Sequence, residues 1–103
     1  MRLVFTDPAA RDLEAIIDYI ALDSPKAAEG VYRAIIKAAD QLRDFPNLGR
    51  AGRLPDTREL PVTSLPYLMV YEVGAGAVTI LAVFHGARDL AQALEARRKE
   101  FEL

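Results

Sequence analysis

Two apolar runs, separated by only four small residues, constrain this chain to a fold that buries a β-hairpin on both of its faces. The runs cover residues 67–73 and 78–84 and are rich in β-branched and aromatic residues, which is typical of strands. Gly74, Ala75 and Gly76 lie between them and indicate a hairpin turn. Because both runs are apolar almost throughout, we expect central strands that other elements cover from both sides.

Two helical patterns precede the hairpin, and each begins with a capping residue followed by a proline. Asp7-Pro8 starts the first pattern and Ser24-Pro25 starts the second. Apolar residues then recur at helical spacing, at Leu13, Ile16, Ile17 and Ile20 in the first and at Val31, Ile35, Ala38, Leu42 and Phe45 in the second. We expect the first helix to end near Asp23 and Pro46 to stop the second. The short connection between them requires an antiparallel helical hairpin.

The remaining elements are a short N-terminal strand, a loop, one more strand and a C-terminal helix. Residues 2–6 are typical of a strand and residues 46–56 of a loop. Residues 58–63 form another strand, in which Pro61 requires an edge or a bulge because it has no amide proton. Residues 88–101 form a helix candidate with a thin apolar stripe at Leu90, Leu94 and Phe101.

The order of these elements predicts a single α+β domain over residues 1–103. It would contain an N-terminal strand, the helical hairpin, a three-stranded antiparallel meander and the C-terminal helix. We expect one shared core that contains Leu13, Ile16, Ile20, Ile35, Leu42, Val70, Ile80 and Leu81.

Composition narrows the classes of function. The chain has no cysteine and a single histidine, His85, so we expect no disulfide, no metal site and no cofactor. No apolar run approaches the roughly 20 residues that span a bilayer, and the first residues meet charge too soon for a secretory signal. These features favour a cytoplasmic protein without a membrane partner.

Charge is distributed unevenly along the chain. The net charge is −2, whereas proteins that grip many phosphates are usually strongly basic. Residues 45–88 nevertheless hold four arginines against three acids, and Arg50, Arg53 and Arg58 fall close together. This segment is a modest candidate for contact with anions, and solvated loop arginines are the alternative.

Four short phrases around the hairpin resemble, in their order and spacing, the RelE/ParE superfamily of bacterial toxins. They are Phe45-Pro46-Asn47-Leu48-Gly49-Arg50, Thr57-Arg58-Glu59-Leu60, Leu65-Pro66-Tyr67 and His85-Gly86-Ala87-Arg88. The resemblance implies the same α+β fold and a toxin of a type II toxin–antitoxin module, held inactive by a cognate antitoxin.

One branch of the superfamily comprises endoribonucleases that cleave ribosome-bound mRNA. For this branch the resemblance implies a general acid/base site, and the residue types that such a site uses are present at His85, Arg58, Glu59 and Arg88. Arg58 and Glu59 are adjacent in a strand, so their side chains should point to opposite faces. The alternative for His85 is that it caps the strand end and forms a local hydrogen bond.

The other branch, typified by ParE, inhibits DNA gyrase by contact and has no recognised catalytic set. The phrases look closer to this branch, so we favour a non-enzymatic toxin over the ribonuclease or a non-toxic interaction domain of the same fold. The candidates for contact with the target are Arg50, Arg53, Arg58 and Arg88. Arg58 and Arg88 have a second interpretation as ion-pair partners of Glu59 and Asp89.

Two apolar sets have both a functional and a structural interpretation. Leu90 and Leu94 are candidates for binding the antitoxin, and the alternative is that they seal the protein's own core. Tyr67 and Tyr71 lie on one strand face, where we expect half-buried core residues with hydroxyls in water instead of an RNA-stacking platform.

Overall fold

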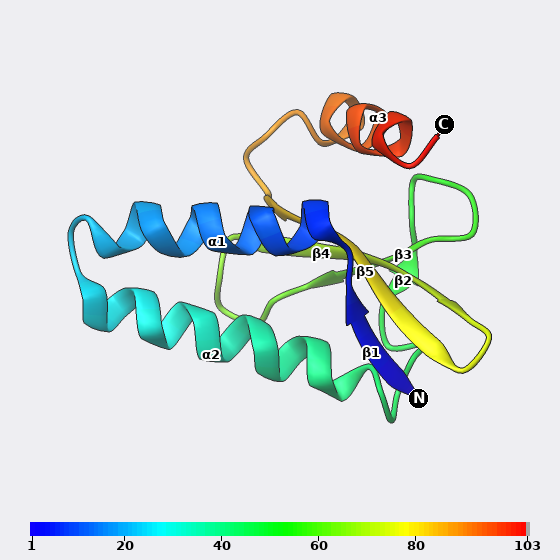
Figure 1. Ribbon diagram of the computed structural model, residues 1–103, viewed down its shortest axis with the longest axis horizontal. Coiled ribbons are helices and arrows are strands. Elements are labelled where there is room, and N and C mark those ends of the chain that lie inside the picture. The colour runs from blue at the N-terminus through cyan, green and yellow to red at the C-terminus, as the bar shows by residue number, and fades with distance from the viewer. Residues whose placement is uncertain (103) are drawn as a thin grey trace.

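A five-stranded mixed sheet separates the helical hairpin from the C-terminal helix (Figure 1). The computed structural model describes residues 1–102. The elements are β1 (Arg2–Phe5), α1 (Asp7–Ala21), α2 (Pro25–Gln41), β2 (Arg50–Ala51), β3 (Arg58–Pro61), β4 (Tyr67–Gly74), β5 (Ala77–His85) and α3 (Leu90–Glu100). The strand order is β1-β5-β4-β3-β2, with β1 parallel to β5 and the other pairs antiparallel. The predicted α+β architecture is confirmed, and β2 is a strand within the expected loop.

The helical hairpin covers one face of the sheet and extends past it. In Figure 1, α1 and α2 run side by side in opposite directions, and the turn that joins them lies well beyond the strands. Ser24 caps α2 as expected, because its hydroxyl accepts a hydrogen bond from the Ala27 amide at 3.1 Å. Within residues 1–102, no helix has both the length and the apolarity needed to cross a membrane.

The ends of both helices differ from the prediction. Thr6, and not Asp7, caps α1, since the Thr6 hydroxyl accepts from the Ala9 amide at 3.2 Å. That hydroxyl also donates to the carbonyl of Ile80 at 3.1 Å, which ties the start of α1 to β5. α2 ends at Gln41, well before Pro46, and Phe45 is 64% exposed. The apolar periodicity continued past the helix because Phe45 matched the spacing without being buried.

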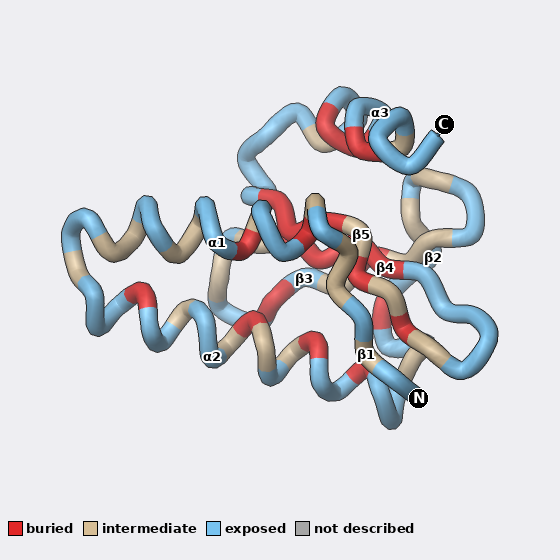
Figure 2. The backbone as a smooth tube through the Cα atoms, in the orientation of Figure 1, coloured by how far each residue is buried: buried red, intermediate tan, exposed pale blue. Residues whose placement is uncertain are grey.

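The sheet divides the interior into two cores, so the prediction of one shared core is wrong. The first core lies between the sheet and the helical hairpin and contains Leu13, Ile35, Leu42 and Ile80, with Ile16 packed against it. The second lies under α3 and contains Leu68, Val70, Ala82, Phe84, Ala93 and Leu94. Ile20 and Leu81 are only half-buried. Figure 2 shows the buried positions gathered on the central strands and on the sides of the helices that face them. Alternate residues of a strand point to opposite faces, and here both faces are covered.

A β-bulge at Leu81 interrupts the pairing of β4 with β5. Val70 pairs with Ala82, but the next residue, Tyr71, pairs with Ile80, so Leu81 has no partner in β4. The sequence predicted an edge or a bulge at Pro61 instead. Pro61 is the last residue of β3, beyond the two residues that pair with β2, so the edge is confirmed and the bulge lies elsewhere.

Tyr71 fixes the segment that leads into β2. Its side chain is fully buried, and its hydroxyl donates to the carbonyl of Pro46 at 2.8 Å and accepts from the amide of Gly49 at 2.8 Å. A Cβ atom on Gly49 would lie 2.7 Å from that hydroxyl, which explains why glycine is needed there. The expectation that the Tyr71 hydroxyl reaches water is wrong, because the chain folds over it.

Tyr71→Phe should therefore destabilise the fold by about 1–3 kcal/mol, because it leaves the buried amide of Gly49 and the partly buried carbonyl of Pro46 without their partner. Urea denaturation followed by circular dichroism measures the loss. Tyr19→Phe removes the same atom from a side chain that is 77% exposed and serves as the control. Equal unfolding midpoints for the two variants would contradict the role assigned to the hydroxyl.

Candidate functional site

A buried carboxylate lies beneath two exposed arginines at the edge of the sheet formed by β2 and β3. Glu59 is paired with Val70, which belongs to the core under α3, so its side chain lies on the α3 face of the sheet. The Glu59 side chain is only 1% exposed. Its Oε2 accepts from the Arg53 amide at 2.8 Å, and its Oε1 lies 3.2 Å from Arg53 Nη1 and 3.5 Å from Arg50 Nη2. Both carboxylate oxygens are therefore already engaged.

The two arginines that contact this carboxylate are themselves largely exposed to solvent. The side chain of Arg50 is 63% exposed and that of Arg53 is 45% exposed. Burial of a charge is costly unless it is paired, and these two guanidinium groups with one amide compensate Glu59. Glu59 is thus part of a structural ion-pair group. Its partners are Arg50 and Arg53, and not Arg58, which is its neighbour in the sequence.

Arg58 lies on the opposite face of β3, as the strand alternation predicted. It pairs with Tyr71, and its Nη1 donates to the carbonyl of Gly49 at 2.8 Å. Arg58 lines an open surface hollow of about 490 Å³ with Val73 and Asp56. Arg58 therefore holds the β2 segment in place from the other side of the sheet.

His85 ends β5 and forms a local hydrogen bond. Its Nδ1 accepts from the Ala87 amide at 3.0 Å, and its ring meets that of Tyr67 edge to face with the centroids 5.5 Å apart. A neutral imidazole that accepts at Nδ1 carries its proton on Nε2. The geometry matches the strand-end cap that the sequence offered as the alternative for this residue.

Arg88 rests on an aromatic ring and forms none of the ion pairs that the structure contains. Its guanidinium carbon lies 4.7 Å from the centre of the Phe84 ring, a cation–π contact. Asp89 instead caps α3 by accepting from the Gln92 amide at 3.2 Å. The proposed pairing of Arg88 with Asp89 is not present among the described residues.

These candidates do not gather around one point. His85 lies opposite Tyr67 and Arg58 lies opposite Tyr71, so the two are separated by four residues along β4, about 13 Å. Arg50 and His85 do line one surface cavity of about 410 Å³, together with Leu90. Across residues 1–102 no three acidic or histidine side chains are grouped to hold a metal ion.

The two leucines proposed for antitoxin binding belong to the core under α3. Leu94 is 2% exposed, and Leu90 is half-buried beside it. Leu94 is unavailable to a partner while α3 rests on the sheet. Leu90 and Leu94 therefore pack as the structural interpretation has it, against the protein's own core.

Sequence reasoning missed a buried ion pair that connects α1, α3 and the bulge. Arg97 donates to both carboxylate oxygens of Asp12 at 2.7 Å each, and its Nη1 also donates to the Leu81 carbonyl at 2.9 Å. Asp12 in turn accepts from the Val83 amide at 3.0 Å. The hydrogen bonds with Asp12 raise the pKa of the Arg97 guanidinium. Helical spacing from Leu90 and Leu94 places position 97 on the same buried stripe, a signal that could have identified it.

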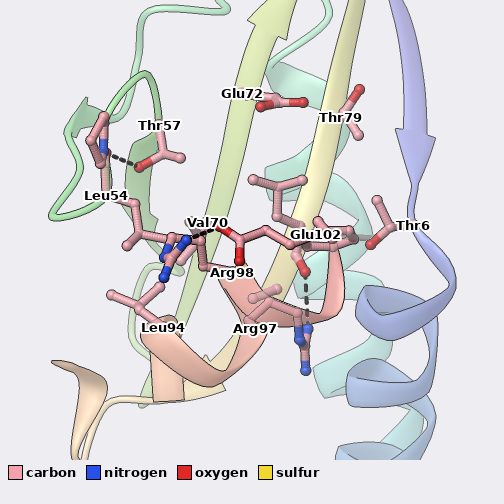
Figure 3. A pocket seen from close by; sticks show the side chains of 14 residues that line it. Thr6, Leu54, Thr57, Val70, Glu72, Thr79, Leu94, Arg97, Arg98 and Glu102 are labelled. Atoms are coloured by element: carbon pink, nitrogen blue, oxygen red, sulfur yellow. Dashed lines mark hydrogen bonds and ion pairs between the residues drawn. The ribbon is translucent and has the colours of Figure 1, made fainter. Parts of the chain in front are cut away.

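Two apolar grooves lie on opposite sides of the molecule. Figure 3 shows the first, of about 430 Å³, between α3, the outer parts of β4 and β5, and the 54–57 loop; the lining residues include Leu54, Val70 and Leu94. Arg98 lies over its middle and pairs with Glu102. The second groove, of about 400 Å³, lies on the helical hairpin and is lined by Phe5, Ala10, Leu13, Glu14, Ile17, Asp18, Tyr32 and Ile36.

Comparison with known proteins gives consistent matches. The family model described as the ParE toxin of the type II toxin–antitoxin system, parDE, matches residues 3–90. The putative toxin Y4kP of Sinorhizobium fredii is 39% identical over 93 residues, which cover 90% of this chain and 96% of that protein. Toxin RelE2 of Caulobacter vibrioides is 40% identical over 87 residues, covering 84% of this chain and 97% of that one.

Solved structures of toxins share the fold. A chain of the chromosomal ParDE system from P. aeruginosa superposes with a TM-score of 0.75 at 28% identity, covering 82% of this chain and 95% of that one. The isolated E. coli RelE toxin superposes with a TM-score of 0.62 at 19% identity, covering 95% and 97%. At that identity the second likeness concerns the fold alone.

Proposed function

This chain belongs to the ParE toxin family of type II toxin–antitoxin systems, and from that premise we propose that it inhibits DNA gyrase by direct contact and that a cognate antitoxin neutralises it. In this proposal residues 1–103 act as one toxin domain in the cytoplasm, where gyrase works.

The dispersal of the acid/base candidates is the observation that supports contact over catalysis. Cleavage of RNA by an attacking 2′-hydroxyl needs a base, an acid and cations around one phosphate. Here both oxygens of Glu59 are held by Arg50 and Arg53, and His85 uses Nδ1 to accept a local hydrogen bond. A contact inhibitor requires no such arrangement, and it requires exposed side chains that a partner can bind.

The groove on the helical hairpin is the surface that we assign to the antitoxin, in place of Leu94. Apolar side chains line it, Glu14 and Asp18 lie along it, and Tyr32 is 46% exposed at its side. Near the tip of the hairpin, Leu22 is 83% exposed. Such a groove fits an amphipathic helix whose apolar face carries flanking basic residues.

RNA cleavage is the second candidate function, because one relative that is 40% identical over 87 residues bears the name RelE2. A single substitution separates the two. His85→Gln keeps a hydrogen-bonding side chain of similar size and removes the imidazole, which is the general acid or base that a nuclease would need. If the protein acts by contact, purified wild-type and His85→Gln proteins should inhibit gyrase supercoiling equally, and the antitoxin should relieve both.

The same substitution would have a large effect on a nuclease. Loss of a general acid or base lowers the rate by about 10²–10⁴, so growth arrest by the variant would disappear. Thermal melting must first establish that His85→Gln folds as the wild-type protein does. A folded variant that has lost its toxicity would move the function to RNA cleavage, and a wild-type protein that leaves growth unaffected would favour the non-toxic interaction domain.

A further inference from the structure

We infer that Glu59 is a positioning residue for Arg50 and Arg53, and that these two arginines form the surface that binds an acidic segment of the target protein. This inference rests on the proposed function, because it takes gyrase as the target. We call Arg50 and Arg53 with their buried carboxylate the Arg50/Arg53 surface.

The first argument is the balance of charge. One guanidinium is enough to neutralise a buried carboxylate, and Arg53 already contacts Glu59 through both its amide and its side chain. Arg50 adds a second positive charge, so two cations face one anion and one positive charge is left over. Since the two arginine side chains are far more exposed than Glu59, the excess faces the solvent. Structural neutralisation of Glu59 alone does not explain this surplus.

The second argument is that the arginines are held before any partner arrives. Arg50 pairs directly with Glu59 across β2 and β3, and the 52–57 loop closes through a 2.8 Å hydrogen bond from Gly52 to Thr57. A Cβ atom on Gly52 would lie 2.3 Å from the Thr57 hydroxyl, so a larger residue would displace that side chain from its hydrogen bond with the Leu54 carbonyl. Side chains that are already ordered lose less conformational entropy on binding, which favours arginine as an anchor of an interface.

The surroundings of Arg50 describe the partner. Arg50 lines the cavity of about 410 Å³ whose other walls include Pro61, Leu65 and Leu90. A ligand there meets a cation beside apolar side chains, which fits a protein segment with a carboxylate next to an apolar residue. A nucleic acid fits less well, because binding to it depends on neutralising many phosphates and the chain carries a net charge of −2.

This surface and the groove on the helical hairpin are on different sides of the molecule. The hairpin packs on one face of the sheet, whereas Glu59 lies on the other face at the edge formed by β2. A substitution in the Arg50/Arg53 surface should therefore leave antitoxin affinity unchanged. That separation makes antitoxin binding an internal control for correct folding.

The test uses Arg50→Gln, which leaves Arg53 to neutralise Glu59, and Arg33→Gln as the matched control on α2. We expect Arg50→Gln to raise the concentration of toxin that halves gyrase supercoiling by about tenfold, as for an interface anchor. Inhibition by Arg50→Gln should also depend less on NaCl concentration than that of the wild type. Arg33→Gln and the antitoxin affinity of both variants should stay within about twofold of wild type.

Glu59→Gln tests the positioning role. Both arginines remain, so the salt dependence of inhibition should persist while the potency falls several-fold, and antitoxin affinity should not change. A variant that loses potency and antitoxin affinity together would show a merely structural role and overturn the assignment for Glu59.

Three further outcomes separate the possibilities. An Arg50→Gln protein as potent as wild type would overturn this inference alone. A wild-type protein without effect on gyrase would overturn the proposed function and the inference with it. Wild-type protein that binds a DNA duplex in the absence of gyrase, with Arg50→Gln weakening that binding, would replace the acidic segment by nucleic acid as the partner.

Discussion

Replacing Asp12 by alanine is expected to lower the free energy of unfolding by about 3–5 kcal/mol, because it removes the buried partner of the Arg97 guanidinium and leaves only Glu100, whose side chain is 46% exposed, as a counter-ion. The side chains of Arg97 and Asp12 are only 10% and 14% exposed. The substitution also removes the acceptor for the Val83 amide at the β5 bulge. Urea denaturation monitored by circular dichroism measures the loss.

Two variants make this prediction specific. Asp40→Ala breaks an ion pair with Arg43 in which both side chains are more than half exposed, and it should cost no more than about 1 kcal/mol. Asp12→Leu combined with Arg97→Met removes both charges and should recover much of the lost stability, since apolar residues of similar size often replace a buried pair without loss. If Asp12→Ala were no more harmful than Asp40→Ala, the ion pair would not be buried as described.

Ile35→Ala is expected to cost about 2–5 kcal/mol, because Ile35 lies at the centre of the core between α2 and the sheet. Its side chain is completely buried, so the deletion leaves a cavity that the surrounding side chains cannot fill. The measurement is again the free energy of unfolding in urea, with the slope of the transition compared to confirm that both proteins unfold in the same way.

Leu22→Ala provides the control for Ile35, since it also shortens an aliphatic side chain but at a position that is 83% exposed. We expect a change within about 0.5 kcal/mol there. A loss at Ile35 that does not exceed the loss at Leu22 would mean that this face of α2 is not packed against the sheet.

Local patterns in the sequence were enough to predict most of the architecture. The caps at Ser24-Pro25 and the periodic residues of α1 and α2 predicted the helical hairpin, and the apolar runs predicted β4 and β5. The bulge at Leu81 was not predicted, because no residue of β5 marks that position as irregular. The Leu81 carbonyl accepts from Arg97 and the nearby Val83 amide donates to Asp12, and both partners are distant in the chain. A bulge of this kind is set by tertiary contacts.

The candidate site was predictable only in its parts. Strand alternation placed Arg58 and Glu59 on opposite faces correctly. The actual partners of Glu59 depended on β2, a strand of two residues that carries too little pattern to be recognised. Once β2 pairs with β3, Arg50 lies directly opposite Glu59, so the ion pairs follow from register and not from adjacency.

The parallel pairing of β1 with β5 sets the order in which this toxin can be assembled on the ribosome. β1 is made first, but its partners, from Ala77 to Ile80, lie 75 residues further along the chain, since Arg2 pairs with Ala77. At about 5–20 residues per second that delay is roughly 4–15 s. The ion pair of Asp12 forms later still, since its partner Arg97 lies 85 residues further along the chain. A nascent chain therefore lacks both its complete sheet and its buried ion pair until Arg97 has been made, so the toxin fold cannot be complete before that point.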